Sequence, residues 1–262
     1  MSDVYDGEDP TGALARELTA LGVTPGTPLL VHASLRTTGL AADTLRDALL
    51  RALGPDGTLV VPAFTEENSD TSAAHFARVR GMTRREAAVF RSRMPAFDPA
   101  RTPCLSMGRL AESVRTAEGA VRSAHPQSSF AAVGARAAEL MARHPLDSHL
   151  GPDSPLGALA AADARVLMIN VGFAACTSFH LAEYLRGGTQ RSYRCVVKAA
   201  DGTPRWVEYE DVSLDDSDFE AIGADFPWGT ERKGQLGGTV TRLFTVADAV
   251  AHAERWMAEK RR

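Results

Sequence analysis

The sequence contains few cysteines, and none of them are spaced to hold a metal or to close a small disulfide frame. Cys104, Cys176 and Cys195 are the only three, and no CxxC motif occurs. We therefore expect neither a disulfide-stapled protein nor a zinc finger.

Long apolar runs and a strong charge of one sign are also missing. No stretch approaches the roughly 20 apolar residues that span a bilayer, and the first ten residues, MSDVYDGEDP, are too acidic and polar for a signal peptide. The formal net charge is −4, which gives no reason to expect nucleic acid and mildly favours cationic ligands. We expect a cytoplasmic protein that contacts no membrane.

Several common functional motifs are absent. There is no GxGxxG of a dinucleotide fold, no GxxxxGK[ST] phosphate loop, no GxSxG of an α/β-hydrolase and no HExxH of a zinc protease. His180 and Glu183 lie three residues apart, but two ligands alone are a weak signal for a metal. We expect no metal.

Helical and strand patterns alternate in what is present. Apolar residues at helical spacing from Thr11 to Leu21 precede a strand pattern from Pro28 to Leu35, and a second such pair ends in a strand at Thr58–Phe64. This order favours a layered α/β fold. Further along, residues 192–212 have the pattern of an antiparallel hairpin, and residues 246–262 that of an amphipathic helix. We expect a loose tail over residues 1–10 and a single domain over 11–262.

Residues 66–100 are less regular. Arginines are interleaved with apolar residues in HFARVRGMTRREAAVFRSRM, which favours a solvated helix or a lid over the sheet edge.

The stretch from Arg165 to Leu185 is the most informative. Val166–Val171 is nearly continuously apolar, as in a strand buried on both faces, and a short loop leads from Gly172 into a helical pattern. Thr177 or Ser178 is a plausible N-cap, which puts His180 in the first turn with Glu183 on the same face. This places His180 at the carboxyl edge of a sheet, where open α/β folds bind ligands. A histidine near a helix start and a carboxylate can act as a general base near neutral pH.

Three of the seven histidines lie in loop-rich, glycine- and serine-flanked settings. They are His32, His125 and His180. We expect the other four to be structural: His75, His144, His149 and His252.

Six ordered motifs then resemble one known family. They are LLVHASLRTTG, GPDGTLVVPAFT, MPAFDPARTP, GAVRSAHPQSSFAAVG, GPDSPL and TSFHLAEY. The chain is similar in these to the aminoglycoside 3-N-acetyltransferase (antibiotic N-acetyltransferase) family. The resemblance implies a layered α/β/α fold with a mixed central sheet, acetyl-CoA as cosubstrate and acetylation of a cationic small-molecule amine. Arg232–Gly238 lacks the spacing of the pyrophosphate loop in the common acetyltransferase superfamily, whose fold we therefore do not expect.

The resemblance also implies site residues. His180 would be the general base, oriented by a carboxylate for which Glu210 is the first choice and Glu183 the second. The residues that would bind coenzyme A are His32, Ser34, Leu35, Arg36, Arg122, Ser123, His125, Ser129 and Phe130. Backbone N–H groups around Ser34–Arg36 would stabilise the oxyanion.

Thr65, Glu66 and Asp70 are expected to bind the cationic substrate. The resemblance implies that the amine acetylated is typically the 3-amino group of a 2-deoxystreptamine ring, with antibiotic resistance as the outcome. Three alternatives stay open. The enzyme could acetylate a different small amine in biosynthesis, Cys176 could carry the acetyl group covalently, or the protein could bind cationic small molecules without catalysis. A homodimer also remains open.

Overall fold

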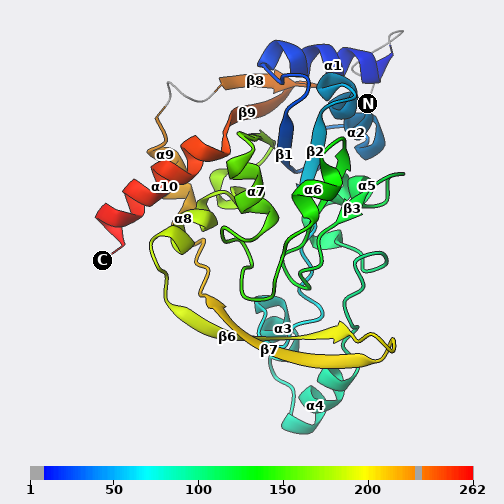
Figure 1. The fold of residues 1–262 in the computed structure, drawn as a ribbon, viewed down its shortest axis with the longest axis vertical. Helices are drawn as coiled ribbons and strands as arrows, with labels where there is room; N and C mark the ends of the chain where they lie inside the picture. The colour runs from blue at the N-terminus through cyan, green and yellow to red at the C-terminus, as the bar shows by residue number, and fades with distance from the viewer. Residues whose placement is uncertain (1–8, 228–231, 262) are drawn as a thin grey trace.

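The structure is a computed structural model that describes residues 9–227 and 232–261. Its centre is a seven-stranded sheet in the order β3-β4-β2-β1-β5-β9-β8 (Figure 1). β1 is parallel to both β2 and β5, whereas β4 and β9 run antiparallel to their neighbours. This sheet confirms the predicted mixed α/β fold. The strands are β1 Pro28–Ala33, β2 Thr58–Pro62, β3 Val121–Arg122, β4 Phe130–Gly134, β5 Arg165–Ile169, β8 Arg232–Leu236 and β9 Thr239–Thr245.

Both faces of the sheet are covered, because successive apolar residues of a strand point to opposite sides. Leu30 and Val166 belong to one hydrophobic cluster, and Leu29 and Leu167 belong to the other. The second cluster includes α1 Pro10–Leu21, α2 Ala42–Leu53 and α5 Arg109–Arg115. The first includes α6 Ala137–Met141, α7 Pro155–Ala161, α8 Phe179–Leu185, α9 Phe219–Ala224 and α10 Val246–Lys260.

The first helix begins slightly earlier than predicted. Asp9 accepts a hydrogen bond from the backbone N–H of Thr11 and pairs with Arg51 at 2.8 Å, and Pro10 starts α1. Proline suits the first turn because its missing N–H would have no partner there. The rest of the predicted tail, residues 1–8, lies outside the described residues.

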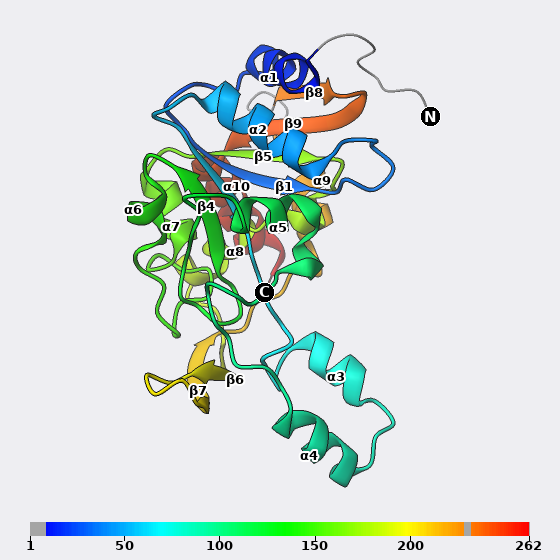
Figure 2. The same ribbon diagram turned by 90° about the vertical axis from the view of Figure 1, so that its right-hand side faces the viewer.

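The predicted hairpin is confirmed as β6 Gln190–Lys198 and β7 Pro204–Val212, a separate two-stranded sheet. Near it lie α3 Ala73–Val79 and α4 Arg84–Ser92, which extend away from the main sheet (Figure 2). Neither of these two helices contains a buried residue. The charged stretch is therefore a pair of short solvated helices.

The topology positions the functional region. β1, β2 and β5 are neighbours and parallel, so the segments that follow them meet at one edge of the sheet. These segments contain the loop after Ala33, the loop after Pro62 and the 3-10 turn η2 Phe173–Ala175 that leads to α8. Within the described residues, no helix is both long and apolar enough to cross a membrane.

Candidate active site

His180 lies in the first turn of α8 and forms a close pair with Glu183. The imidazole Nδ1 is 2.7 Å from Glu183 Oε2, and the ring packs against Phe219 with centroids 4.6 Å apart. The side chain of His180 is 13% exposed, which keeps its ring in reach of a ligand. The predicted side-chain cap is not made, since Ser178 precedes the helix without a capping hydrogen bond.

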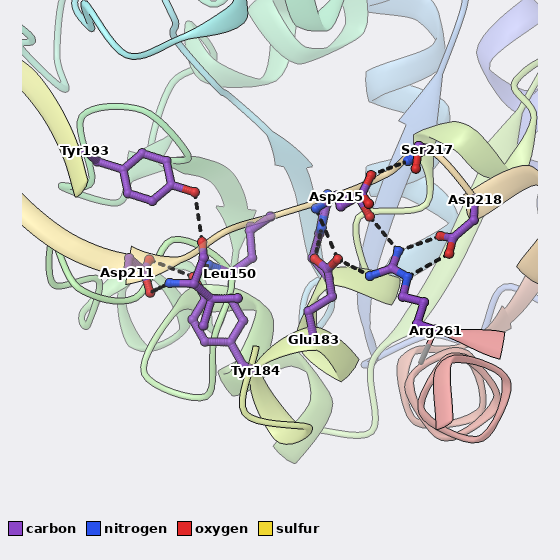
Figure 3. A network of polar contacts seen from close by, with 11 residues as sticks. Leu150, Glu183, Tyr184, Tyr193, Asp211, Asp215, Ser217, Asp218 and Arg261 are labelled. Atoms are coloured by element: carbon purple, nitrogen blue, oxygen red, sulfur yellow. Dashed lines mark hydrogen bonds and ion pairs between the residues drawn. The ribbon is translucent and has the colours of Figure 1, made fainter. Parts of the chain in front are cut away.

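Glu183 is held on its other oxygen as well. Oε1 accepts hydrogen bonds from the guanidinium of Arg261 and from the backbone N–H of Asp215 (Figure 3). Arg261 also pairs with Asp218 and donates to the carbonyl of Asp215. The hydrogen bond to Asp218, followed by that to Glu183, raises the pKa of Arg261. Glu183 is only 3% exposed in its side chain, and a buried carboxylate needs such partners.

The first choice for the orienting carboxylate was wrong. Glu210 is exposed on β7, opposite Ser192 in the hairpin, and the contact with His180 is made by Glu183. The inward-facing carboxylate of that strand is the next residue, Asp211, which binds the backbone N–H of His149 and the hydroxyl of Tyr184. Side chains alternate along a strand, so a one-residue error selects the opposite face.

A cavity of about 380 Å³ adjoins the imidazole and is lined by His180, His32, Glu66 and Asp216, among others. His32 is 6% exposed, and burial lowers its pKa to about 4, so its ring is uncharged near neutral pH. The Nε2 atom of His32 is buried and has no hydrogen-bond partner in the described part of the chain. Such an atom in a cavity wall is a candidate contact for a ligand.

A second cavity of about 710 Å³ adjoins the first through Ala33, Ser106 and Met107. Ser34, Leu35 and Arg36 line it, and their binding of coenzyme A stays a prediction. The opposite wall is the 3-10 turn η1 Leu105–Met107 and the start of α5, including Arg109. Sequence reasoning missed Arg109. The available signal was the glycine before it, Gly108, which adopts a φ of 92° immediately before the helix.

Asn170 fixes the loop that follows β1, and sequence reasoning missed it too. It adopts a left-handed φ of 53°, and its side chain donates to the carbonyls of Ser34 at 3.0 Å and Arg36 at 3.1 Å. The backbone N–H of Ser34 donates to Ile169, so it is not free to act as an oxyanion donor as expected.

The other five residues expected to bind coenzyme A line neither cavity. Arg122 ties three segments together by donating to Ser129 Oγ and to the carbonyls of Ala63 and Thr102. Its burial lowers the pKa of Arg122 to about 10. The other four of these five residues are buried, each at 1% exposure or less: Ser123, His125, Ser129 and Phe130. The polar side chains of the segment RSAHPQSSF hydrogen-bond to buried backbone groups, both of the segment itself and of neighbouring segments.

His125 illustrates this role. Its Nδ1 accepts from the backbone N–H of Gln127 and Ser128, and its ring packs at a tilt against those of His144 and His149. His144, His149 and His252 are buried and hydrogen-bonded to backbone or hydroxyl groups, as their structural assignment predicted. His75 differs, because it lines a third cavity and its Nδ1 has no partner among the described residues.

Of the residues expected to bind the cationic substrate, only Glu66 lines a cavity. Thr65 is buried and donates to the carbonyl of Pro126, and the buried carboxylate of Asp70 pairs with Arg91 and Arg194. Glu66 lines both the cavity beside His180 and the third one. Asp216 adds a second carboxylate to the cavity beside His180. The acidic run LDDSD was its only signal in the sequence.

Cys176 is a poor nucleophile in this setting. It is completely buried, and burial raises the pKa of its thiol to about 12, so the reactive thiolate is disfavoured. Its proposed role as an acetyl carrier is not supported. No cluster of three or more His, Cys, Asp or Glu side chains able to hold a metal occurs within residues 9–227 and 232–261.

The geometry can be compared with known proteins. Residues 30–258 match the family model described as aminoglycoside 3-N-acetyltransferase. The chain is 33% identical to aminoglycoside N(3)-acetyltransferase VII of Streptomyces paromomycinus, over 97% of this chain and 93% of that protein.

Solved structures agree with the family match. YokD from Bacillus subtilis superposes with a TM-score of 0.88 at 29% identity, over 96% of this chain and 94% of that one. The enzyme AAC-IIIb in a binary complex with CoASH has a TM-score of 0.82 at 29% identity, over 95% and 96% of the two chains. The chain belongs to the aminoglycoside 3-N-acetyltransferase family.

Proposed function

We propose that this protein transfers the acetyl group of acetyl-CoA to an amine, with His180 as general base and an aminoglycoside as acceptor. The 3-amino group of the 2-deoxystreptamine ring is the proposed site of acetylation, and resistance to the antibiotic is the proposed outcome. The observation that carries this proposal is that His180, paired with Glu183, lines a cavity that adjoins a second cavity of about 710 Å³.

The pair suits proton removal from an amine. Glu183 accepts from Nδ1–H, which leaves the lone pair of Nε2 for the cavity that His180 lines. As the amine nitrogen attacks the thioester carbonyl, Nε2 takes its proton, the carbon–sulfur bond breaks, and the thiolate receives a proton in turn. Glu183 would stabilise the imidazolium formed in between.

Two other features support binding of the two substrates. Arg36 and Arg109 line the second cavity and could pair with the phosphates of coenzyme A. Glu66 and Asp216 line the catalytic cavity and could pair with ammonium groups of the acceptor. His32 is uncharged near neutral pH and could donate a hydrogen bond to the thioester carbonyl. The cytoplasm, which supplies acetyl-CoA, is the compartment that this reaction needs.

One observation favours a second candidate, a small amine with fewer positive charges. Residues 72–93 contain six arginines and one glutamate, and Arg78 and Arg93 line the third cavity, which shares Glu66 with the catalytic one. The positive charges of these arginines would repel a polycationic acceptor near this surface. The same catalytic pair would then serve a biosynthetic acetylation.

Thiol release from acetyl-CoA tests both candidates. The acceptors are gentamicin, kanamycin and apramycin, together with monoamines and zwitterionic amino sugars. An aminoglycoside that is acetylated at its 3-amino group, shown by NMR of the product, supports the first candidate. Turnover confined to the less charged amines supports the second. Binding of coenzyme A in calorimetry without turnover of any amine would contradict both and leave a non-catalytic binder.

A further inference from the structure

We propose that Arg261, the residue that follows α10, is a positioning residue that keeps His180 in the tautomer required of the base. This inference rests on the proposed function of His180. Arg261 contacts Glu183 and does not itself line the catalytic cavity. Its effect on the reaction therefore passes through the carboxylate.

The argument starts from the hydrogen bonds of Glu183. Oε2 lies 2.7 Å from Nδ1 of His180. Oε1 accepts from Arg261 and from the backbone N–H of Asp215 (Figure 3). The positive charge of Arg261 beside Oε1 favours the ionised form of Glu183, which accepts hydrogen bonds at both oxygens. The cation beside a carboxylate that is 3% exposed also offsets the cost of burying its charge.

An ionised Glu183 determines where the imidazole carries its proton. Oε2 then accepts from Nδ1–H, and Nε2 holds the lone pair. Without Arg261, the buried carboxylate would lose its guanidinium partner, and a proton held between Glu183 and the imidazole would take the place of that positive charge. Either Glu183 would donate to Nδ1, or His180 would become an imidazolium. In both forms Nε2 carries hydrogen and cannot accept the proton of an amine.

The placement of Arg261 is itself well defined. Its Nε and Nη2 atoms donate to the two oxygens of Asp218, and Nη2 also donates to the carbonyl of Asp215. Asp218 and Asp215 belong to the loop that follows β7, whereas Glu183 is on α8. A planar guanidinium can bridge these groups in one orientation, which a lysine ammonium cannot reproduce in full.

The test compares Arg261→Met and Arg261→Lys with Lys260→Met, an exposed neighbour on α10 that serves as the matched control. We expect Arg261→Met to lower kcat about 10- to 100-fold, as loss of a group that orients a functional histidine does, with KM values within about twofold. Arg261→Lys should retain part of the lost kcat. In a further variant, Arg261→Ala, which leaves room for a free guanidinium ion, added guanidinium at non-denaturing concentration should partly restore kcat. Melting temperatures establish that the variants are folded.

A second readout does not depend on turnover. The ¹⁵N chemical shifts of the His180 ring, assigned by their loss in His180→Ala, distinguish the two neutral tautomers and the imidazolium. We expect the Nδ1–H form in the wild type and an Nε2-protonated form in Arg261→Met.

An unchanged tautomer in folded Arg261→Met, or a kcat equal to that of Lys260→Met, would overturn the role of Arg261 while leaving His180 as the base. An active His180→Ala variant would instead overturn the proposed function.

Discussion

The edge of the main sheet and the α3–α4 pair are built differently, although Glu66 lines cavities in both regions. At the sheet edge, Glu183 and His32 are buried and their surroundings are packed. In the α3–α4 pair no residue is buried, and Phe76 is 57% exposed. We infer that the residues at the sheet edge determine the rate of the chemical step, while the α3–α4 pair affects only which acceptor amine binds. Substitutions in the two regions should therefore have different kinetic signatures.

The largest effect is expected from Glu183→Gln. An amide can neither accept from Nδ1–H as strongly nor stabilise the imidazolium, so kcat should fall by about a hundredfold or more. Glu210→Gln is the matched control on the exposed face of β7 and should keep its kcat. Steady-state rates of thiol release measure both variants, and equal losses would show that the structural choice between the two carboxylates is mistaken.

The stability of the buried region should depend on pH. Burial lowers the pKa of His32 and His144 to about 4 and that of His149 to about 3. Below pH 6.5 the unfolded chain binds protons that the folded chain does not, so the free energy of unfolding falls as the pH drops toward 4. The buried carboxyl of Asp211, whose pKa burial raises, acts in the opposite direction.

A fully expressed shift of this size is worth roughly 3 kcal/mol for one histidine. Urea unfolding at pH 7 and pH 5 should therefore give a clearly smaller free energy at pH 5, and His32→Phe should reduce the difference. Identical free energies at the two pH values would contradict the burial of these rings as uncharged groups.

His32 should affect function and stability in opposite ways. Its Nε2 has no hydrogen-bond partner in the described chain, so His32→Leu removes a buried unsatisfied group and should not lower the melting temperature. The same change should lower kcat/KM about tenfold if the ring contacts the substrates. A lower melting temperature with unchanged kcat/KM would show that His32 is structural.

The smallest effects are expected in the α3–α4 pair. Arg78→Ala and Arg93→Ala should lower KM for polycationic acceptors only severalfold, because screened surface charges interact weakly, and should leave kcat and the melting temperature unchanged. Arg84→Ala, an exposed arginine of the same pair that lines none of the three cavities described, is the control. A large loss of kcat in either variant would contradict the inference that the α3–α4 pair does not affect the chemical step.

Much of the fold and one half of the His180–Glu183 pair could be predicted from the sequence. The strand before Gly172 and the spacing of His180 and Glu183 are local features, and local features follow from periodicity. The choice between Glu183 and Glu210 depended on which face of β7 is turned inward, and that is a tertiary property.

Long-range contacts explain the other errors. The polar segment around His125 looks like a ligand site because its side chains hydrogen-bond, but their partners are its own backbone and distant carbonyls. Arg261 is 78 residues from Glu183 in the sequence, and no local pattern links them. Asn170 similarly holds a loop more than 130 residues earlier.

The most direct test of the central claim is single-turnover acetyl transfer by wild type and His180→Gln, with acetyl-CoA and a saturating amine. Glutamine keeps a polar side chain beside Glu183 but offers no nitrogen lone pair that can take up a proton. We predict that coenzyme A still binds and that the rate of transfer falls about 10²- to 10⁴-fold, the range of general base catalysis. A folded His180→Gln variant that transfers acetyl at the wild-type rate would contradict the account.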